Sequence, residues 1–215
     1  ADLRAATTGP KEQDFCPAGL IALAGGEVAR IEGQSSEALR KYEGAAGSKA
    51  YPELSGALMG GEYAEMGKWD LAVKTLDAAV TDSGGAAFAR LTRAWILRKR
   101  YRARPEDADA AAWLDKALAD AGEAAKAGHA VGPLAVAAVQ VDRAELAISR
   151  GQGGAEALAA AEAAVSAAQK DGDWVAQEIA AALALRRADM DEREGKDPRP
   201  SLDRSLGAFD QAASG

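Results

Sequence analysis

Seven basic residues lie within the stretch RLTRAWILRKRYRAR, residues 90–104, of a chain that carries a formal net charge of −7. Guanidinium groups pair with carboxylates and phosphates, so this stretch is a candidate binding site. An acidic chain does not offer the net basic surface that nucleic-acid binding requires. The sequence therefore predicts no nucleic-acid partner, and it leaves a choice between an acidic partner and a solvated helix face.

Cys16 and His129 are the only cysteine and the only histidine, and they lie far apart in the sequence. A zinc site of the usual kind needs several cysteine or histidine ligands. A catalytic Cys–His pair needs the two side chains within hydrogen-bond distance of each other. We interpret Cys16 as a small packed hydrophobe and His129 as a polar loop residue. The sequence predicts no metal, no cofactor and no catalytic residue.

Carboxylates cluster in two places, and paired carboxylates could serve acid–base chemistry. The two clusters are Glu106, Asp107 and Asp109, and Asp189, Asp191, Glu192 and Glu194. We interpret both as capped or solvated helix ends, since acidic side chains favour the positive end of a helix. The prediction is a protein that is not an enzyme, and an enzyme is the alternative that a pair of buried carboxylates would support.

The elements that position these residues are predicted to be helices. Strong helix formers fill most of the chain, β-branched residues are sparse, and aromatic residues make up 5%. The longest apolar run, AVGPLAVAAVQV from Ala130, is too short to cross a bilayer. We expect an all-α protein with closely packed helices and no membrane-spanning segment.

Small residues recur with a period of 34. At offsets of 3, 7, 12, 16 and 19, Gly26 is followed by Ala29, Gly33, Ala38, Tyr42 and Ala45, and Gly60 by Tyr63, Gly67, Ala72, Leu76 and Ala79. The first glycine would let two helices approach closely, and the glycine at offset 7 would end the first helix. Looser copies start at Ala94 and Ala144.

This pattern resembles the tetratricopeptide repeat (TPR), whose period is 34 residues. The resemblance implies an all-α, right-handed TPR-like α-solenoid of about five antiparallel helix pairs, with repeats near 19–52, 53–86, 87–124, 137–171 and 174–213. The family's tryptophan and closing proline are absent from most repeats, and an irregular helical bundle is the alternative. Residues 1–14 are predicted to form an extended arm before a single domain at 15–215. The register of the last pair stays open.

TPR arrays commonly bind peptides or protein segments on the concave surface formed by the first helix of each repeat. The resemblance places eight candidate binding residues on that surface: Glu27, Arg30, Glu65, Leu91, Trp95, Arg98, Lys99 and Arg102. The asparagines of the TPR carboxylate clamp are missing from the matching positions. The resemblance therefore implies a protein or peptide partner without identifying it.

The basic stretch divides into two features when it is placed on a helix at 100° per residue. Arg90, Arg93, Arg100 and Arg104 form one stripe, which we interpret as a solvated face, with docking of an acidic partner as the alternative. Arg98 lies instead among apolar neighbours.

A buried guanidinium needs a carboxylate, because an unpaired buried charge costs several kcal/mol. We expect Arg98 either to pair with Glu62 or Glu65, or to meet a ligand carboxylate together with Trp95 and Lys99.

Taken together, these features predict a non-catalytic TPR-like adaptor or scaffold that binds a protein or peptide in its concave groove. The alternative is an extracytoplasmic TPR protein that binds small molecules or assists transport. Self-association is a further expectation, because the last predicted helix could expose Leu206 and Phe209. The compartment is periplasmic or secreted if Ala1 follows a cleaved signal peptide, and cytoplasmic otherwise.

Overall fold

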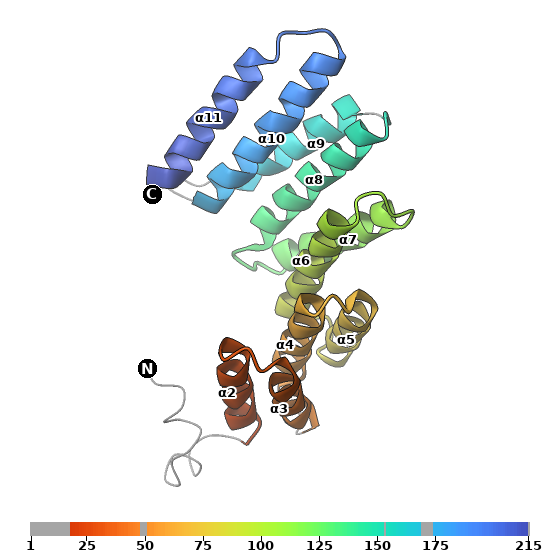
Figure 1. Ribbon diagram of the computed structural model, residues 1–215, viewed down its shortest axis with the longest axis vertical. Helices are drawn as coiled ribbons and strands as arrows, with labels where there is room; N and C mark the ends of the chain where they lie inside the picture. Colours follow the sequence, from red (N-terminus) through yellow and green to blue (C-terminus); the bar gives the residue numbers. More distant parts are fainter. Residues whose placement is uncertain (1–17, 48–50, 153, 169–173, 215) are drawn as a thin grey trace. The chain divides into compact units, whose positions relative to one another are not determined.

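The computed structural model describes residues 18–47, 51–152, 154–168 and 174–214, and every regular element in these ranges is an α-helix (Figure 1). The helices are α2 (Ala18–Ile31), α3 (Ser35–Gly47), α4 (Pro52–Glu65), α5 (Trp69–Asp82), α6 (Ala87–Ala103), α7 (Ala110–Lys126), α8 (Gly132–Ser149), α9 (Gly154–Ala168), α10 (Trp174–Arg193) and α11 (Arg199–Ser214). The predicted arm at 1–14 and Cys16 lie outside the described residues. The expected all-α fold is confirmed.

The chain divides into two compact units, residues 1–96 and 97–215, with the division inside α6. In the first unit, α3 packs against both α2 and α4, and α4 packs against α5. In the second unit, α8 packs against α7, α9 and α10, and α10 packs against α9 and α11. From α2 to α5 and from α7 to α11, helices that follow one another in sequence are therefore neighbours in space, as in a helical repeat. The prediction of one domain at 15–215 stays a prediction.

We call the first helix of each predicted repeat an A helix (α2, α4, α6, α8 and α10) and the second a B helix. Four A helices end in a glycine with a positive φ: Gly33 (75°), Gly67 (72°), Gly151 (66°) and Gly195 (69°). In each turn the glycine N–H and the following N–H bond to carbonyls of the last helical turn, for example Lys68 N to Tyr63 O at 2.8 Å. Glycine adopts this left-handed conformation without strain, and it closes the helix end. The expected turns at Gly33 and Gly67 are confirmed.

Two further glycines set the distance between the A and B helices of the first two pairs. A methyl group added at Gly26 would lie 2.3 Å from Cε1 of Tyr42, and one added at Gly60 would lie 2.6 Å from Cγ of Leu76. Tyr42 and Leu76 are fully buried, and each follows its glycine by sixteen residues. The sequence period of 34 therefore corresponds to a repeated contact between two helices.

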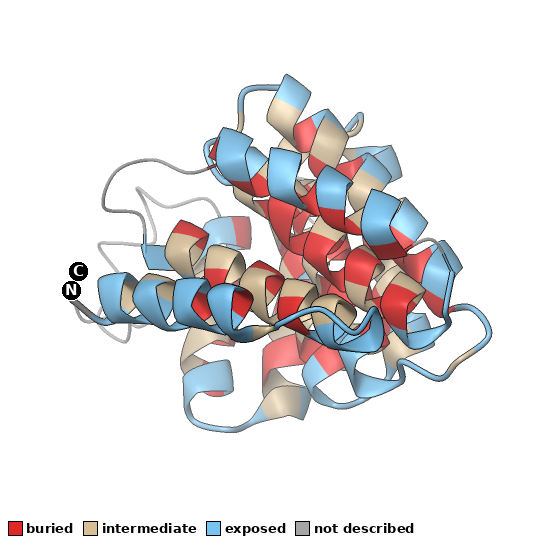
Figure 2. Cartoon of the chain, turned by 90° about the horizontal axis from the view of Figure 1, so that it is seen from above, coloured by how far each residue is buried: buried red, intermediate tan, exposed pale blue. Residues whose placement is uncertain are grey.

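The buried residues lie on the inner faces of the helices, and most of them are small or aliphatic (Figure 2). In the last helix pair, Ser201 and Ser205 of α11 are buried. The hydroxyl of Ser201 donates to Oδ2 of Asp191 at 2.9 Å, and that of Ser205 donates to the carbonyl of Ala181 at 3.1 Å. The side chains on the opposite face of α11 remain exposed. Among the helices of the described ranges, none is long and apolar enough to cross a membrane.

The bounds of the predicted repeats stay a prediction. In the predicted fourth repeat, at 137–171, α8 begins earlier, at Gly132, and Pro133 lies in its first turn, where a proline is tolerated. In the third pair, the turn between α6 and α7 is longer than in the other pairs.

Candidate functional site

The basic stretch and α8 meet at a buried carboxylate. The side chain of Asp142 has no exposed surface, and it accepts a hydrogen bond from Nε of Arg98 at 2.6 Å. Arg102 binds the second carboxylate oxygen through Nη2 at 2.9 Å and through Nε at 3.2 Å. Arg98 and Arg102 are four residues apart on α6 and therefore share one helix face. One carboxylate is thus held between two guanidinium groups.

The two arginines differ in how much of each side chain is exposed. The side chain of Arg98 is 8% exposed, whereas that of Arg102 is 58% exposed. Burial lowers the pKa of Arg98, the carboxylate of Asp142 opposes that shift, and the charge of Arg102 adds to it. Both guanidinium groups contact the carboxylate of Asp142. Asp142 holds Arg102, and the exposed part of the Arg102 side chain presents its charge to solvent.

Charged side chains continue from this group across α8 to α10. Glu145 lies one turn after Asp142 on α8, and its carboxylate is 3.4 Å from Nε of Arg186 on α10. Arg186 also donates from Nη1 to Asp189 at 3.0 Å. We call Arg98, Arg102, Asp142, Glu145, Arg186 and Asp189 the charged row; all six belong to the second unit. Opposite charges therefore follow one another over three A helices.

Tyr101 is buried beneath this row, at 2% exposure. Burial raises the pKa of its hydroxyl, and the carboxylates of Glu145 and Asp142 raise it further. The phenol therefore stays protonated over the physiological pH range and serves the site as a neutral, packed group.

The prediction that the arginine stripe on α6 is exposed to solvent is wrong for Arg93. Its residue exposure is 9%, and its Nη1 donates to Asp77 of α5 at 2.8 Å. Arg90 is half-buried and donates from Nε to the carbonyl of Gly85 at 2.9 Å. The guanidinium of Arg100 lies over the ring of Trp113, 4.2 Å from its centroid. These three arginines therefore contact groups of the protein and do not form a solvated face.

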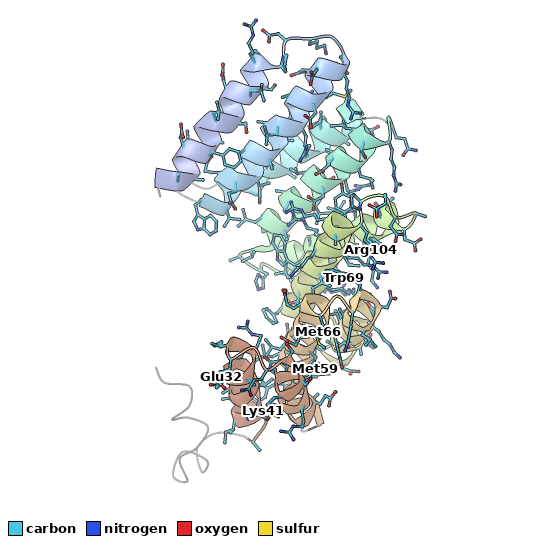
Figure 3. The ribbon with its side chains drawn as sticks, viewed as in Figure 1. Glu32, Lys41, Met59, Met66, Trp69 and Arg104 are labelled. Atoms are coloured by element: carbon cyan, nitrogen blue, oxygen red, sulfur yellow. The ribbon has the colours of Figure 1, made fainter. Side chains whose placement is uncertain are left out.

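Arg104, just beyond the end of α6, is the exposed member of that stripe (Figure 3). The remaining predicted groove residues differ in exposure. Leu91 is buried at 4% exposure, Trp95 is half-buried, and Glu65 and Lys99 are exposed. Leu91 is thus part of the packing, whereas Glu65 and Lys99 reach solvent.

Glu27 and Arg30 form an ion pair on α2, with Nη2 of Arg30 2.8 Å from the carboxylate. The hydroxyl of the buried Tyr42 donates to the same carboxylate from α3. Partial burial would raise the pKa of Glu27, but the hydrogen bonds from Arg30 and Tyr42 outweigh burial and lower it. Burial and the Glu27 charge raise the pKa of Tyr42 in turn. Both predicted groove residues on α2 are therefore held by contacts within the chain.

Sequence reasoning named Arg98 and Arg102 but missed their partner, Asp142. The signal is present in the sequence, because Asp142 directly follows the apolar run that ends at Val141. A lone carboxylate in such a run indicates a buried charge with a basic partner. The expected pairing of Arg98 with Glu62 or Glu65 stays a prediction.

Within the described ranges, no group of three or more His, Cys, Asp or Glu side chains is placed to hold a metal ion. The carboxylates at the helix ends make local contacts. Asp107 accepts from the N–H of Asp109 at 3.0 Å, Asp191 binds Ser201, and Glu194 pairs with Lys196. The ring of His129 accepts at Nδ1 from the N–H of Val131 at 3.3 Å. These contacts hold the ends of helices.

No protein-family model matches the chain, and no curated protein matches it. Among solved structures, the crystal structure of MamA, a TPR-like helical protein, is similar to it with a TM-score of 0.51 and 17% sequence identity. The alignment covers 88% of this chain and 92% of the MamA chain. At this identity the likeness concerns the fold. The chain has a TPR-like helical-repeat fold of the all-α solenoid class.

Proposed function

We propose that the chain is a non-catalytic TPR-like scaffold that binds a protein or peptide partner through its A helices. The charged row of the second unit supports this proposal. Its side chains come from α6, α8 and α10: Arg98 and Arg102 bind Asp142, and the carboxylate of Glu145 lies within ion-pair distance of Arg186. Side chains fixed in advance lose little conformational freedom on binding, which favours affinity.

Arg102 is the residue of the row best placed to contact a partner. Its Nε and Nη2 atoms bind Asp142, and within the part of the chain that the structure describes Nη1 makes no hydrogen bond. An arginine has five N–H donors in a planar fork, so the outer edge of this guanidinium suits a carboxylate. We infer that the partner presents a carboxylate at this point, from either an acidic side chain or its C-terminus.

The test compares two exposed arginines near the end of α6. The tagged full-length chain captures partners from a lysate of its source organism, and quantitative mass spectrometry measures each captured protein. Arg102→Ala should lower the capture of specific partners severalfold while leaving helicity and the Arg98–Asp142 pair intact. Arg104→Ala is the matched control, because Arg104 is exposed and lies outside the row. Equal capture by the two variants would refute the assignment to Arg102.

A further inference from the structure

A groove runs along α4 and α5 in the first unit, with a volume of about 760 Å³. Met59 and Tyr63 line it from α4, and Leu71 and Ala78 line it from α5 (Figure 3 labels Met59). The lining residues span twelve residues of each helix, and the eleven steps of 1.5 Å between the first and the last correspond to a length of about 16 Å. An open groove of this length matches about three turns of a helix.

Gly56 of α4 forms part of the floor of the groove, where α4 and α5 approach closely. A methyl group at Gly56 would lie 2.3 Å from Cβ of Ala79, so the two helix backbones approach closely at the floor. Above that floor, Leu71 is 47% exposed and Ala78 is also exposed. Methionine adapts its shape to an apolar partner, and Met59 supplies that adaptability here.

Two opposite charges mark the groove on α5. Lys74 and Asp82 both line it, and they are eight residues apart, or about 12 Å along the helix. Over the described ranges, neither side chain makes a hydrogen bond or an ion pair. An occupant of the groove therefore needs a basic group near Asp82 and an acidic group near Lys74.

The exposed face of α11 has these properties. Leu202, Leu206 and Phe209 are 39%, 63% and 43% exposed, and at 100° per residue they fall within an arc of about 60°. Arg199 precedes this apolar stripe and Asp210 follows it, and both lie on the same flank at this helical spacing. Arg199 bonds only locally, to Asp197, with 82% of its side chain exposed. The stripe is about 10 Å long, which fits between Lys74 and Asp82. Arg199 and Asp210 lie about 16 Å apart along α11, against about 12 Å between Lys74 and Asp82, and the long side chains of Arg199 and Lys74 span the difference.

We propose that α11 of one copy of this chain docks in the α4–α5 groove of a second copy. The apolar stripe enters the groove between Met59 and Ala78, Arg199 meets Asp82, and Asp210 meets Lys74. In this arrangement α11 runs antiparallel to α5. Both surfaces are exposed in the single chain, and a contact between two different surfaces lets copies add one after another. This contact is separate from the charged row and does not depend on the function proposed above.

The first test is self-association of the full chain, measured by sedimentation velocity over a range of concentrations. The wild type should form dimers and larger species as its concentration rises. Leu206→Glu and Ala78→Trp should each remain monomeric, because the first places a charge in the stripe and the second fills the groove. Ala160→Trp is the control, since Ala160 is an exposed alanine on α9. Circular dichroism checks that each variant keeps its helicity.

Mixing separates the proposed contact from a symmetric one. Ala78→Trp keeps an intact α11 and Leu206→Glu keeps an intact groove, so an equimolar mixture should form one-to-one dimers and nothing larger. If α11 paired with α11 instead, Leu206→Glu would dissociate the assembly and Ala78→Trp would not, and the proposal would be overturned. A wild type that stays monomeric at all concentrations overturns it as well.

Charge reversal tests the register. Lys74→Glu and Asp210→Lys should each weaken association by about threefold to tenfold, because each replaces an attraction with a repulsion. The double variant should recover most of the loss, since the opposite charges face each other again. Failure of the double variant to recover would contradict the pairing of Lys74 with Asp210.

Discussion

Asp142 is a carboxylate that two guanidinium groups share in the interior of the second unit. Moving an ion out of water costs several kcal/mol, and pairing with an opposite charge offsets roughly that amount. The trio therefore adds little net stability, although the loss of either buried member, Arg98 or Asp142, is costly. Its main consequence is geometric, because Asp142 holds Arg102 in one position at the surface.

Removing Asp142 should cost much more stability than removing Arg102. Asp142→Ala breaks a buried ion pair with Arg98, and we expect a loss of about 3–5 kcal/mol in the free energy of unfolding. Arg102→Ala should lose less than about 1 kcal/mol, because its ion pair is largely exposed. Urea titration followed by circular dichroism measures both values.

The double variant Arg98→Met/Asp142→Leu is the control for charge burial. It should lose less stability than Asp142→Ala alone, because apolar side chains of similar volume replace both charges. A double variant as unstable as the single one would show that the loss comes from packing and not from breaking the charge pair.

Acid should weaken the contact between α2 and α3. The pKa of Glu27 is lowered in the folded protein, so the carboxylate stabilises the fold above the ordinary glutamate pKa of 4.5, and this contribution is lost as the pH falls through the lowered value. The stability difference between wild type and Glu27→Gln should therefore shrink below about pH 4.5. Urea titrations at several pH values measure it, and a difference that does not change with pH would count against the assigned shift.

Part of the site can be predicted from the sequence. The apolar neighbours of Arg98 indicate that it needs a carboxylate, and the spacing of Arg98 and Arg102 places both on one face of α6. The identity of the carboxylate depends on how α8 packs against α6, and Asp142 is 44 residues from Arg98. Local periodicity carries no information about such a distant contact.

At the scale of the helices, glycine performs two tasks that alternate along the chain. Gly33, Gly67, Gly151 and Gly195 end A helices with a positive φ, whereas Gly26 and Gly60 bring two helices together. Because both tasks recur at fixed offsets, the 34-residue period predicts the first two helix pairs well. The burial of Arg93 was not predicted, since it depends on the neighbours of α6 and not on the pattern of α6 itself.

Two adjacent glycines of α4 should respond oppositely to the same substitution. Gly60→Ala should lower the free energy of unfolding by about 1–3 kcal/mol, because the new methyl group would overlap Leu76. Gly61→Ala should raise it by about 0.5–1 kcal/mol, because nothing lies within 4 Å of the added carbon and alanine favours the helix. Thermal and urea unfolding measure both effects. Equal responses would show that the A and B helices are not in close contact at Gly60.

At the scale of the whole molecule, the chain divides into two compact units whose helices contact mainly their sequence neighbours. In repeat proteins, stability is approximately a sum of local and nearest-neighbour contributions. A local defect should therefore loosen the helices around it more than distant ones. The repeated helix pairs make this property predictable from the sequence, whereas the division within α6 was not predicted.

Hydrogen exchange can measure that locality. Gly60→Ala should speed amide exchange in α4, α5 and their neighbours and leave α10 and α11 nearly unchanged. Mass spectrometry of peptides after exchange distinguishes these regions, and Gly61→Ala is the matched control. Uniform acceleration along the chain would show that the protein unfolds as one cooperative body.

The boundary between the two units lies inside α6, and this limits where the chain can be divided into fragments that fold independently. Ile96 belongs to the core of the first unit, whereas Arg98 compensates Asp142 in the second. A piece that stops before α6 lacks Ile96, and a piece that starts after α6 leaves Asp142 buried without its cations. A cut at the boundary itself divides α6 between the two pieces, so fragments that each keep the whole helix overlap over residues 87–103.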